Sequence, residues 1–269
     1  MSRRSQTQFG RKQFATAAKA VIFYALANAL AVRAAELKVV TSGAFTAAYI
    51  ELAPEYERAT HNKLTTEFGP SMGITHNAIP VRLARNEPID VVIMAAPALD
   101  KLIQEGKIRA ESRRKLVLSK IGMAVKSGTP KPDISTVEAL KRTLLAAKSI
   151  AYSDSASGVY LSTELFPKLG IAEQIRGKSK MIPADPVGGV VASGEFEIGF
   201  QQISELRPVK GIEIVGEIPP GAQRITIFAA GIPVTAKQPE AARALIDWLA
   251  SQAAYGAIRK SGLEPIGSQ

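Results

Sequence analysis

Four short segments of the sequence carry the residue types that bind small anions. They are residues 41–46, 69–73, 153–158 and 185–189, all rich in glycine or hydroxyl residues. In each, a predicted strand ends and a predicted helix begins at once. The first turn of a helix leaves N–H groups unpaired and carries partial positive charge, small residues admit an anion to the backbone, and hydroxyls add neutral donors. Each segment alone is also an ordinary helix cap. If the four segments meet at one cleft, together they predict a binding site for an anion.

Four side chains in or near the second segment could add chemistry. Ser71 lies in an uncharged stretch between two glycines, which favours a contact with ligand. Arg82 and Arg85 follow on the helix predicted to run from Gly73 to about residue 85. An arginine facing the cleft would grip carboxylates with two hydrogen bonds, although a solvated helix face is the more common place for it. His76, in the first predicted turn of that helix, could contact ligand, act as a general base or lie at the surface.

Several other chemistries find no support in the sequence. With no cysteine, thiolate metal sites, iron–sulfur ligation and a catalytic thiol are excluded, and with only two histidines a multi-histidine metal site is not expected. The glycines form neither a phosphate loop nor a dinucleotide-binding fingerprint. Residues 155–158 are not a nucleophile elbow. We therefore expect no cofactor and no metal.

The positive charge of the chain is concentrated at its beginning. The whole sequence has a formal net charge of +10, but residues 1–34 hold six basic residues and no acidic one. The remainder has 28 basic and 24 acidic residues, so nucleic-acid binding is not expected. A basic stretch, a short apolar run at 20–32 and small residues before position 35 are typical of a secretory signal peptide. We predict cleavage after residue 34 and a soluble, periplasmic mature protein without stable membrane insertion. Whether the general secretory or the twin-arginine route is used stays open.

Strands and helices alternate through the rest of the chain. Strands are predicted at 37–41, 64–68, 90–94, 121–125, 149–152, 196–200 and within 225–234. Helices are predicted at 47–58, from 73 to 85, from a capping box at 135–138 to 147, at 157–168, at 187–193 and twice within 239–262. Such alternation predicts an α/β fold with mostly parallel sheets covered by helices.

This pattern also predicts two lobes. We place the strands that cross between them near 119–126 and 223–234. Lobe one would then combine residues 36–118 and 235–269, and lobe two would comprise residues 119–234. Ligands of α/β sheets bind at the carboxyl ends of strands, which here would meet in a cleft between the lobes.

The mature chain resembles the molybdate-binding periplasmic proteins, a branch of the type II solute-binding proteins of ABC importers. The opening strand with its serine loop, the 69–73 loop and the stretches 87–94, 193–199 and 239–265 carry the resemblance. It implies a two-lobed type II periplasmic-binding-protein fold with the ligand cleft between the lobes. It also implies a small anionic ligand and an ABC permease as partner, and we expect a monomer.

Carried over residue by residue, the resemblance implies anion contacts through hydroxyls and backbone N–H groups. They fall on Ser42, Ser71, the Ala156–Ser157 turn and Val187, with Gly43 and Met72 adjoining the two serines. A fifth family contact is a tyrosine, and Gln202 stands in its place. This departure, with His76 and Arg82 on a longer helix, suits an organic polycarboxylate better than a compact oxyanion.

A second hypothesis follows from the same residues. The aconitate isomerases have a similar fold, and such an enzyme shifts a proton between carbons of a tricarboxylic acid. Ser42, Ser71, Ser157, Arg82 and Gln202 could hold three carboxylates, and His76 could carry the proton. Because the resemblance by itself implies a receptor, we favour a periplasmic anion-binding protein for uptake, with the isomerase as the alternative.

Overall fold

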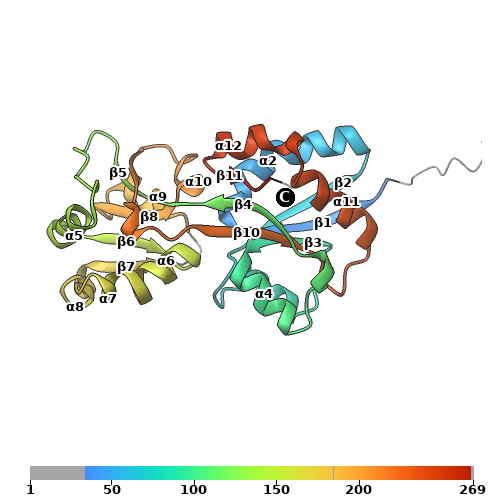
Figure 1. The fold of residues 1–269 in the computed structure, drawn as a ribbon, viewed down its shortest axis with the longest axis horizontal. Coiled ribbons are helices and arrows are strands. Elements are labelled where there is room, and N and C mark those ends of the chain that lie inside the picture. The colour runs from blue at the N-terminus through green and yellow to red at the C-terminus, as the bar shows by residue number, and fades with distance from the viewer. Residues whose placement is uncertain (1–33, 184, 268–269) are drawn as a thin grey trace, which may run out of the picture. The chain divides into compact units, whose positions relative to one another are not determined.

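Two mixed β-sheets organise the chain in the computed structural model, which describes residues 34–183 and 185–267 (Figure 1). The first sheet has the order β11-β4-β10-β3-β1-β2, and the second has the order β7-β6-β8-β5-β9. Helices flank both sheets, as predicted for a type II periplasmic-binding-protein fold. The predicted export signal lies outside the described residues except for Ala34, and it stays a prediction.

The elements of the first sheet come from both ends of the described chain. Its strands are β1 (Glu36–Thr41), β2 (Lys63–Phe68), β3 (Val91–Ala95), β4 (Arg114–Ser119), β10 (Thr226–Gly231) and β11 (Glu264–Pro265). Its helices are α2 (Gly43–Thr60), α3 (Ile79–Ala84), α4 (Ala96–Gln104), α11 (Pro239–Leu249) and α12 (Tyr255–Ser261). Strands β1, β2 and β3 are parallel, whereas β10 runs antiparallel to β3 and β4.

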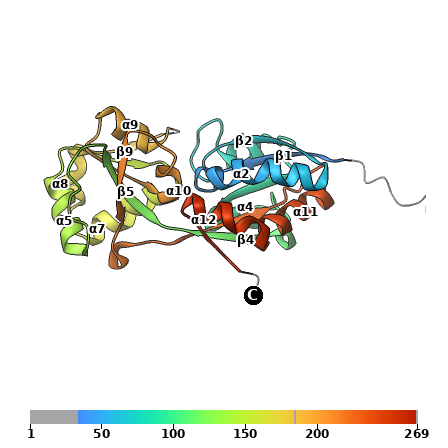
Figure 2. The same ribbon diagram turned by 90° about the horizontal axis from the view of Figure 1, so that it is seen from above.

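The second sheet is built from the middle of the chain. Its strands are β5 (Ile121–Lys126), β6 (Ile150–Ser153), β7 (Ser179–Ile182), β8 (Ile198–Gln202) and β9 (Ile212–Glu217). Its helices are α5 (Val137–Ala146), α6 (Ala156–Tyr160), α7 (Phe166–Lys168), α8 (Ala172–Ile175), α9 (Val187–Ser193) and α10 (Ile203–Leu206). The chain enters this sheet directly from β4 and leaves it from β9 to β10 (Figure 2).

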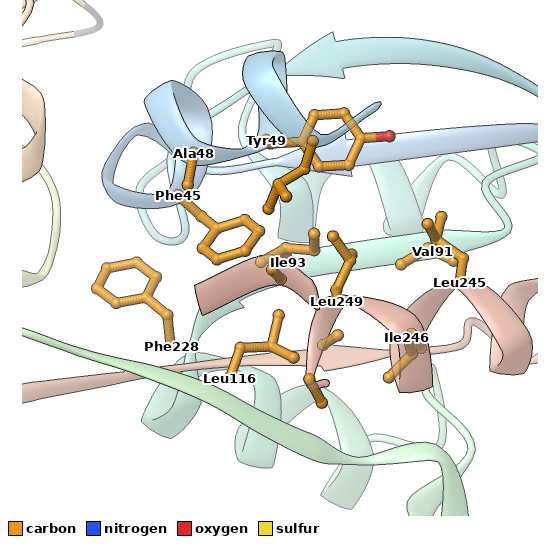
Figure 3. Close-up of a cluster of buried hydrophobic side chains, with 14 of the residues drawn as sticks. Phe45, Ala48, Tyr49, Val91, Ile93, Leu116, Phe228, Leu245, Ile246 and Leu249 are labelled. Atoms are coloured by element: carbon orange, nitrogen blue, oxygen red, sulfur yellow. The ribbon is translucent and has the colours of Figure 1, made fainter. Parts of the chain in front are cut away.

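Alternating side chains of the central strands supply the cores on the two faces of the first sheet. In β3, Val91 and Ile93 pack on the side of α2 and α11, whereas Val92 and Met94 pack on the side of α3 and α4. Figure 3 shows Ile93 among side chains of α2 and α11, including Phe45 and Leu249. Burying an aliphatic or aromatic side chain of this size stabilises a fold by roughly 1.5–3 kcal/mol. These cores fix the strand ends that carry the predicted anion-binding segments.

The helix after the 69–73 segment begins later than the sequence predicts. It starts at Ile79, and residues 71–77 form bends and a turn, with Gly73 at a φ of 92°. Pro80 explains the start, because proline has no N–H and fits the first turn of a helix, where that group has no partner. The N-cap of α5 is Thr136 rather than the predicted Ser135, and its hydroxyl accepts from the Ala139 N–H at 3.1 Å. Because Ala139 then stands where a capping box needs glutamate or glutamine, the predicted capping box is not formed.

Among the described residues, no helix combines the length and the apolar character that crossing a bilayer would require.

Candidate functional site

A pocket of about 420 Å³ lies where strand ends of the two sheets face each other. All four predicted anion-binding segments contribute to its lining, through Gly43 and Thr46, Gly69 and Pro70, residues 153–155, and Asp185 and Pro186. A fifth segment, 201–209, adds Gln201, Ser204, Glu205, Pro208 and Val209. The remaining lining residues are Ala47, Ile50, Phe68 and Asn77.

The N-terminus of α2 opens onto this pocket. Gly43, Thr46 and Ala47, all in the first turns of this 18-residue helix, line the pocket. The N-cap Ser42 has an extended backbone, and its hydroxyl makes no capping hydrogen bond. The first turn carries no acidic side chain. The unpaired N–H groups and the positive end of the helix dipole are therefore available to an anionic group.

Two predicted serines are buried beside the pocket and already have protein partners. Ser71 is fully buried, and its Oγ accepts a hydrogen bond from the Ala95 N–H at 2.9 Å. Ser157 Oγ lies 3.0 Å from Ser153 Oγ, which also accepts from the Gly158 N–H at 3.3 Å. Ser153 lines the pocket directly, whereas Ser71 and Ser157 lie behind it. Both predicted serines thus shape the loops that form the wall.

Val187 and Gln202 also have partners within the protein. The Val187 N–H donates to Gln201 Oε1 at 3.0 Å. Gln202 is buried, accepts from Ser119 Oγ at 2.8 Å and donates through Nε2 to Thr226 Oγ1 at 3.3 Å. Ser119 and Thr226 lie on the two strands where the chain enters and leaves the second sheet. Gln202 therefore ties together the connections between the sheets.

The predicted cation and the predicted base both lie outside the pocket lining. The Arg82 side chain is 7% exposed and pairs with Glu67 and Glu87. Hydrogen bonds from Lys38 and Arg82 hold the pKa of Glu67 below its ordinary value. His76 is exposed, and its carbonyl oxygen accepts from Arg85 at 2.9 Å. Met72 and Ala156 are half-buried, and Ala156 packs against the core of the first sheet.

Glu205 is an ionisable residue of the pocket that was not expected from the sequence. It lies on α10, which packs against α2 (Figures 1 and 2). Burial raises the pKa of its carboxyl from 4.5 to about 7, and the charge of Asp154 adds to the rise. Hydrogen bonds from the Gln201 side chain and the Gln202 backbone act in the opposite direction. The only signal in the sequence was one glutamate shortly after a buried strand.

A carboxyl group with these properties can exchange protons near neutral pH. Ordinary glutamates stay ionised there, whereas a group with a pKa near 7 is present in both forms and can take up and return a proton. The Gln201 side chain makes a hydrogen bond to the Glu205 carboxyl, and Oε1 of Gln201 accepts from the Val187 N–H. One amide side chain thus links α9, which begins at Val187, to α10, which carries Glu205.

The electrostatics of the pocket are unusual for an anion site. Asp154, Asp185 and Glu205 line it, and no lysine or arginine occurs among the described lining residues. An anionic ligand would therefore depend on neutral donors and on the α2 N-terminus. Within the described residues, no group of three or more histidine, cysteine, aspartate or glutamate side chains could hold a metal ion.

Comparison with known proteins relates the whole described fold to ligand-binding proteins. Residues 37–264 match the family model described as bacterial extracellular solute-binding protein. The chain is 53% identical over 233 residues to an aconitate isomerase of a Pseudomonas species, with 87% of this chain and 89% of that protein covered.

More distant similarities point to molybdate-binding proteins. The chain is 28% identical over 245 residues to the molybdate-binding protein ModA of Azotobacter vinelandii, which covers 87% of this chain and 92% of that one. The solved structure of the A. vinelandii periplasmic molybdate-binding protein matches with a TM-score of 0.68 at 21% identity, covering 87% of this chain and all of that one. At this identity, the structural likeness supports the fold alone.

Proposed function

This chain belongs to the family of bacterial extracellular solute-binding proteins, and from this premise we propose that it binds aconitate in the pocket and isomerises it by a proton shift. The observation that carries the proposal is Glu205, a pocket carboxyl with a pKa of about 7. The 53% identity to an aconitate isomerase supports the same reaction. The protein would thus both bind the solute and catalyse its conversion.

The reaction needs one group that removes a proton and returns it to another carbon. The ionised Glu205 takes a proton from the methylene carbon of the substrate, and the resulting negative charge spreads over the allyl system and its carboxylates. The protonated Glu205 then gives the proton to the former vinylic carbon two positions away, so the double bond moves and no atom is gained or lost. If the carbon chain of the substrate rotates before the proton is returned to it, the cis and trans isomers are exchanged. We assign this role to Glu205 in preference to His76, because Glu205 lines the pocket and the exposed His76 does not.

The substrate carboxylates would be held mainly by neutral groups. The α2 N-terminus offers the positive end of its helix dipole, and Ser42 offers a buried hydroxyl that has no partner in the protein. We propose that Ser71 and Ser157 support these contacts indirectly, by hydrogen bonds that fix the loops around the pocket. Gln202 would fix the two strands that connect the sheets. Neutral donors and a helix dipole can stabilise the negative charge that develops on the substrate.

Uptake of a small anion is the second candidate function. The similarity to the molybdate-binding protein ModA favours it, since the name of that relative describes binding without chemistry. In this role a monomeric, exported protein, released from the signal at residues 1–34, would close over its ligand in the periplasm and dock on an ABC permease.

One experiment on the purified protein separates the two functions. Incubation with trans-aconitate, followed by proton NMR, should show the cis isomer if the protein is an isomerase. Thermal shifts with molybdate, tungstate, sulfate and tricarballylate, a saturated tricarboxylate, identify the bound class in parallel. Stabilisation by molybdate without conversion of aconitate would establish the receptor and contradict the isomerase.

A further inference from the structure

Two buried hydroxyl groups near Glu205 have no partner in the protein. Four buried side-chain nitrogen or oxygen atoms of the described residues lack a hydrogen-bond partner, and they belong to Ser42, Thr75, Arg109 and Ser204. Ser42 and Ser204 are each 1% exposed. A buried hydroxyl without a partner has lost its hydrogen bonds to water without replacement, so such groups are rare in native proteins.

Both hydroxyls belong to the elements on either side of the Glu205 carboxyl. Ser204 lines the pocket and directly precedes Glu205 on α10. Ser42 is the N-cap of α2 and directly precedes Gly43, beside which the Glu205 carboxyl lies. Ser42, Thr75 and Arg109 are not part of the pocket lining, but of these three only Ser42 directly precedes a lining residue. One unpaired hydroxyl therefore lies in the wall of the pocket where the proposed reaction occurs, and the other lies next to it.

The chemistry of these hydroxyls suits a carboxylate. A serine hydroxyl donates one hydrogen bond, and hydrogen bonds to an ionised acceptor are stronger than those between neutral groups. No lysine or arginine occurs among the described residues that line the pocket, so uncharged donors must bind the carboxylate. A carboxylate held next to Glu205 would bring its neighbouring carbon, which carries the acidic hydrogens, toward the Glu205 carboxyl.

We propose that Ser204 is a ligand-binding residue, whose Oγ acts together with Ser42 Oγ to hold the substrate carboxylate beside the reacting carbon. This inference rests on the proposed function, because it names the group of the tricarboxylic acid that each hydroxyl recognises. It adds a contact from the second sheet to the one that the resemblance implies for Ser42.

The test compares Ser204→Ala with a matched buried serine that has partners. Ser112 is 4% exposed, and its Oγ donates to the Arg109 carbonyl at 2.6 Å and accepts from the Ile232 N–H at 2.8 Å. Ser112→Ala should lower the Tm of the unliganded protein and leave ligand affinity unchanged. Ser204→Ala should keep or raise the Tm of the unliganded protein and weaken tricarballylate binding by roughly 10- to 100-fold, as measured by calorimetry.

Two further measurements keep the inference distinct from the proposed function. Ser204→Ala should raise the KM for trans-aconitate, and the Ser42→Ala/Ser204→Ala double variant should lose less affinity than the two single losses combined, because both hydroxyls serve one carboxylate. Ser204→Cys, which keeps the size of the side chain and weakens its donor, should give an intermediate affinity. If the wild type converts aconitate but Ser204→Ala and Ser204→Cys bind and react normally, or if Ser204→Ala lowers the unliganded Tm as Ser112→Ala does, the inference is wrong. If the wild type neither converts aconitate nor binds tricarballylate, the proposed function itself fails.

Discussion

The carboxyl group of Glu205 occupies the space that any side chain at Gly43 would need. A Cβ built on Gly43 would lie 2.9 Å from Cδ of Glu205 and closer still to Oε1. Glycine at the first position of α2 therefore allows the helix N-terminus and the carboxyl to meet. This close approach places a proton-accepting group of one sheet against a helix dipole of the other.

Gly43→Ala should displace the Glu205 carboxyl and reduce kcat. Because a misplaced catalytic group lowers the rate steeply, we expect a loss of about 100-fold in kcat for aconitate conversion. Circular dichroism should show the same helix content. Gly189→Ala is the matched control, since Gly189 is a helical glycine with no atom near its missing Cβ. Equal activity of Gly43→Ala and Gly189→Ala would contradict this account of the close approach.

The activity of the wild type should depend on pH through Glu205. The free enzyme needs an ionised carboxylate to take the proton, and burial raises the pKa of Glu205 to about 7. The value of kcat/KM should therefore fall about tenfold for each pH unit below 7 and level off above it. Initial rates between pH 5 and 9 measure this profile. A value of kcat/KM that stays level from pH 9 down to pH 5 would show that an unperturbed carboxylate, or none, carries the proton.

Glu205 should also make the folded protein less stable at high pH. Its pKa rises from 4.5 in the unfolded chain to about 7 in the fold, so between these values the folded state binds more protons. The free energy of unfolding attributable to this group is therefore highest below pH 4.5 and falls as the pH rises through 7. Glu205→Gln removes this loss, and its Tm should exceed that of the wild type at pH 8 by a larger margin than at pH 4.5. A difference in Tm that does not vary with pH would contradict the raised pKa. For a chain of this size, a change of 1 kcal/mol in the free energy of unfolding corresponds to a shift of roughly 2–4 °C in Tm.

Arg82 should matter more for stability than for ligand binding. Arg82→Ala removes a buried partner that Glu67 and Glu87 share, although Lys38 still lies 2.9 Å from Glu67 and 3.8 Å from Glu87. We expect a loss of about 1–3 kcal/mol in unfolding free energy, less than for a fully buried pair because the Glu67 side chain is 39% exposed. Urea denaturation measures this loss. Arg176→Ala removes an exposed arginine paired with Glu173 and should change stability by less than about 0.5 kcal/mol. If Arg82→Ala raised the KM for aconitate and Arg176→Ala did not, Arg82 would be a ligand contact, which contradicts this prediction.

Much of the fold could be predicted from local pattern. The central strands β3 and β5 are short apolar runs, apart from the exposed Lys126 at the end of β5, because both of their faces are buried. Strands β7 and β9 are the edges of the second sheet and are largely half-exposed, so they lack this signal. The four segments that the sequence predicts to bind an anion all contribute to the pocket lining, and they could be picked out because each is a short run of consecutive residues.

The long-range relationships of the site left no local signal. Glu205 resembles any glutamate at the start of a helix, and its raised pKa arises from packing against α2 and from Asp154, which is far away in sequence. Arg82 looks unpaired in sequence, because its partner Glu67 lies on β2, 15 residues before it, and meets it only in the fold. The partners of Gln202 are likewise on strands distant in sequence.

The central claim is that Glu205 moves the proton of a bound tricarboxylic acid. Its most direct measurement compares Glu205→Gln with the wild type, using proton NMR for conversion of trans-aconitate and calorimetry for binding of tricarballylate. The account predicts that the wild type forms the cis isomer, whereas Glu205→Gln binds the tricarboxylate but converts trans-aconitate about 10²–10⁴-fold more slowly. Conversion at the wild-type rate by Glu205→Gln, or binding without conversion by the wild type, would contradict it.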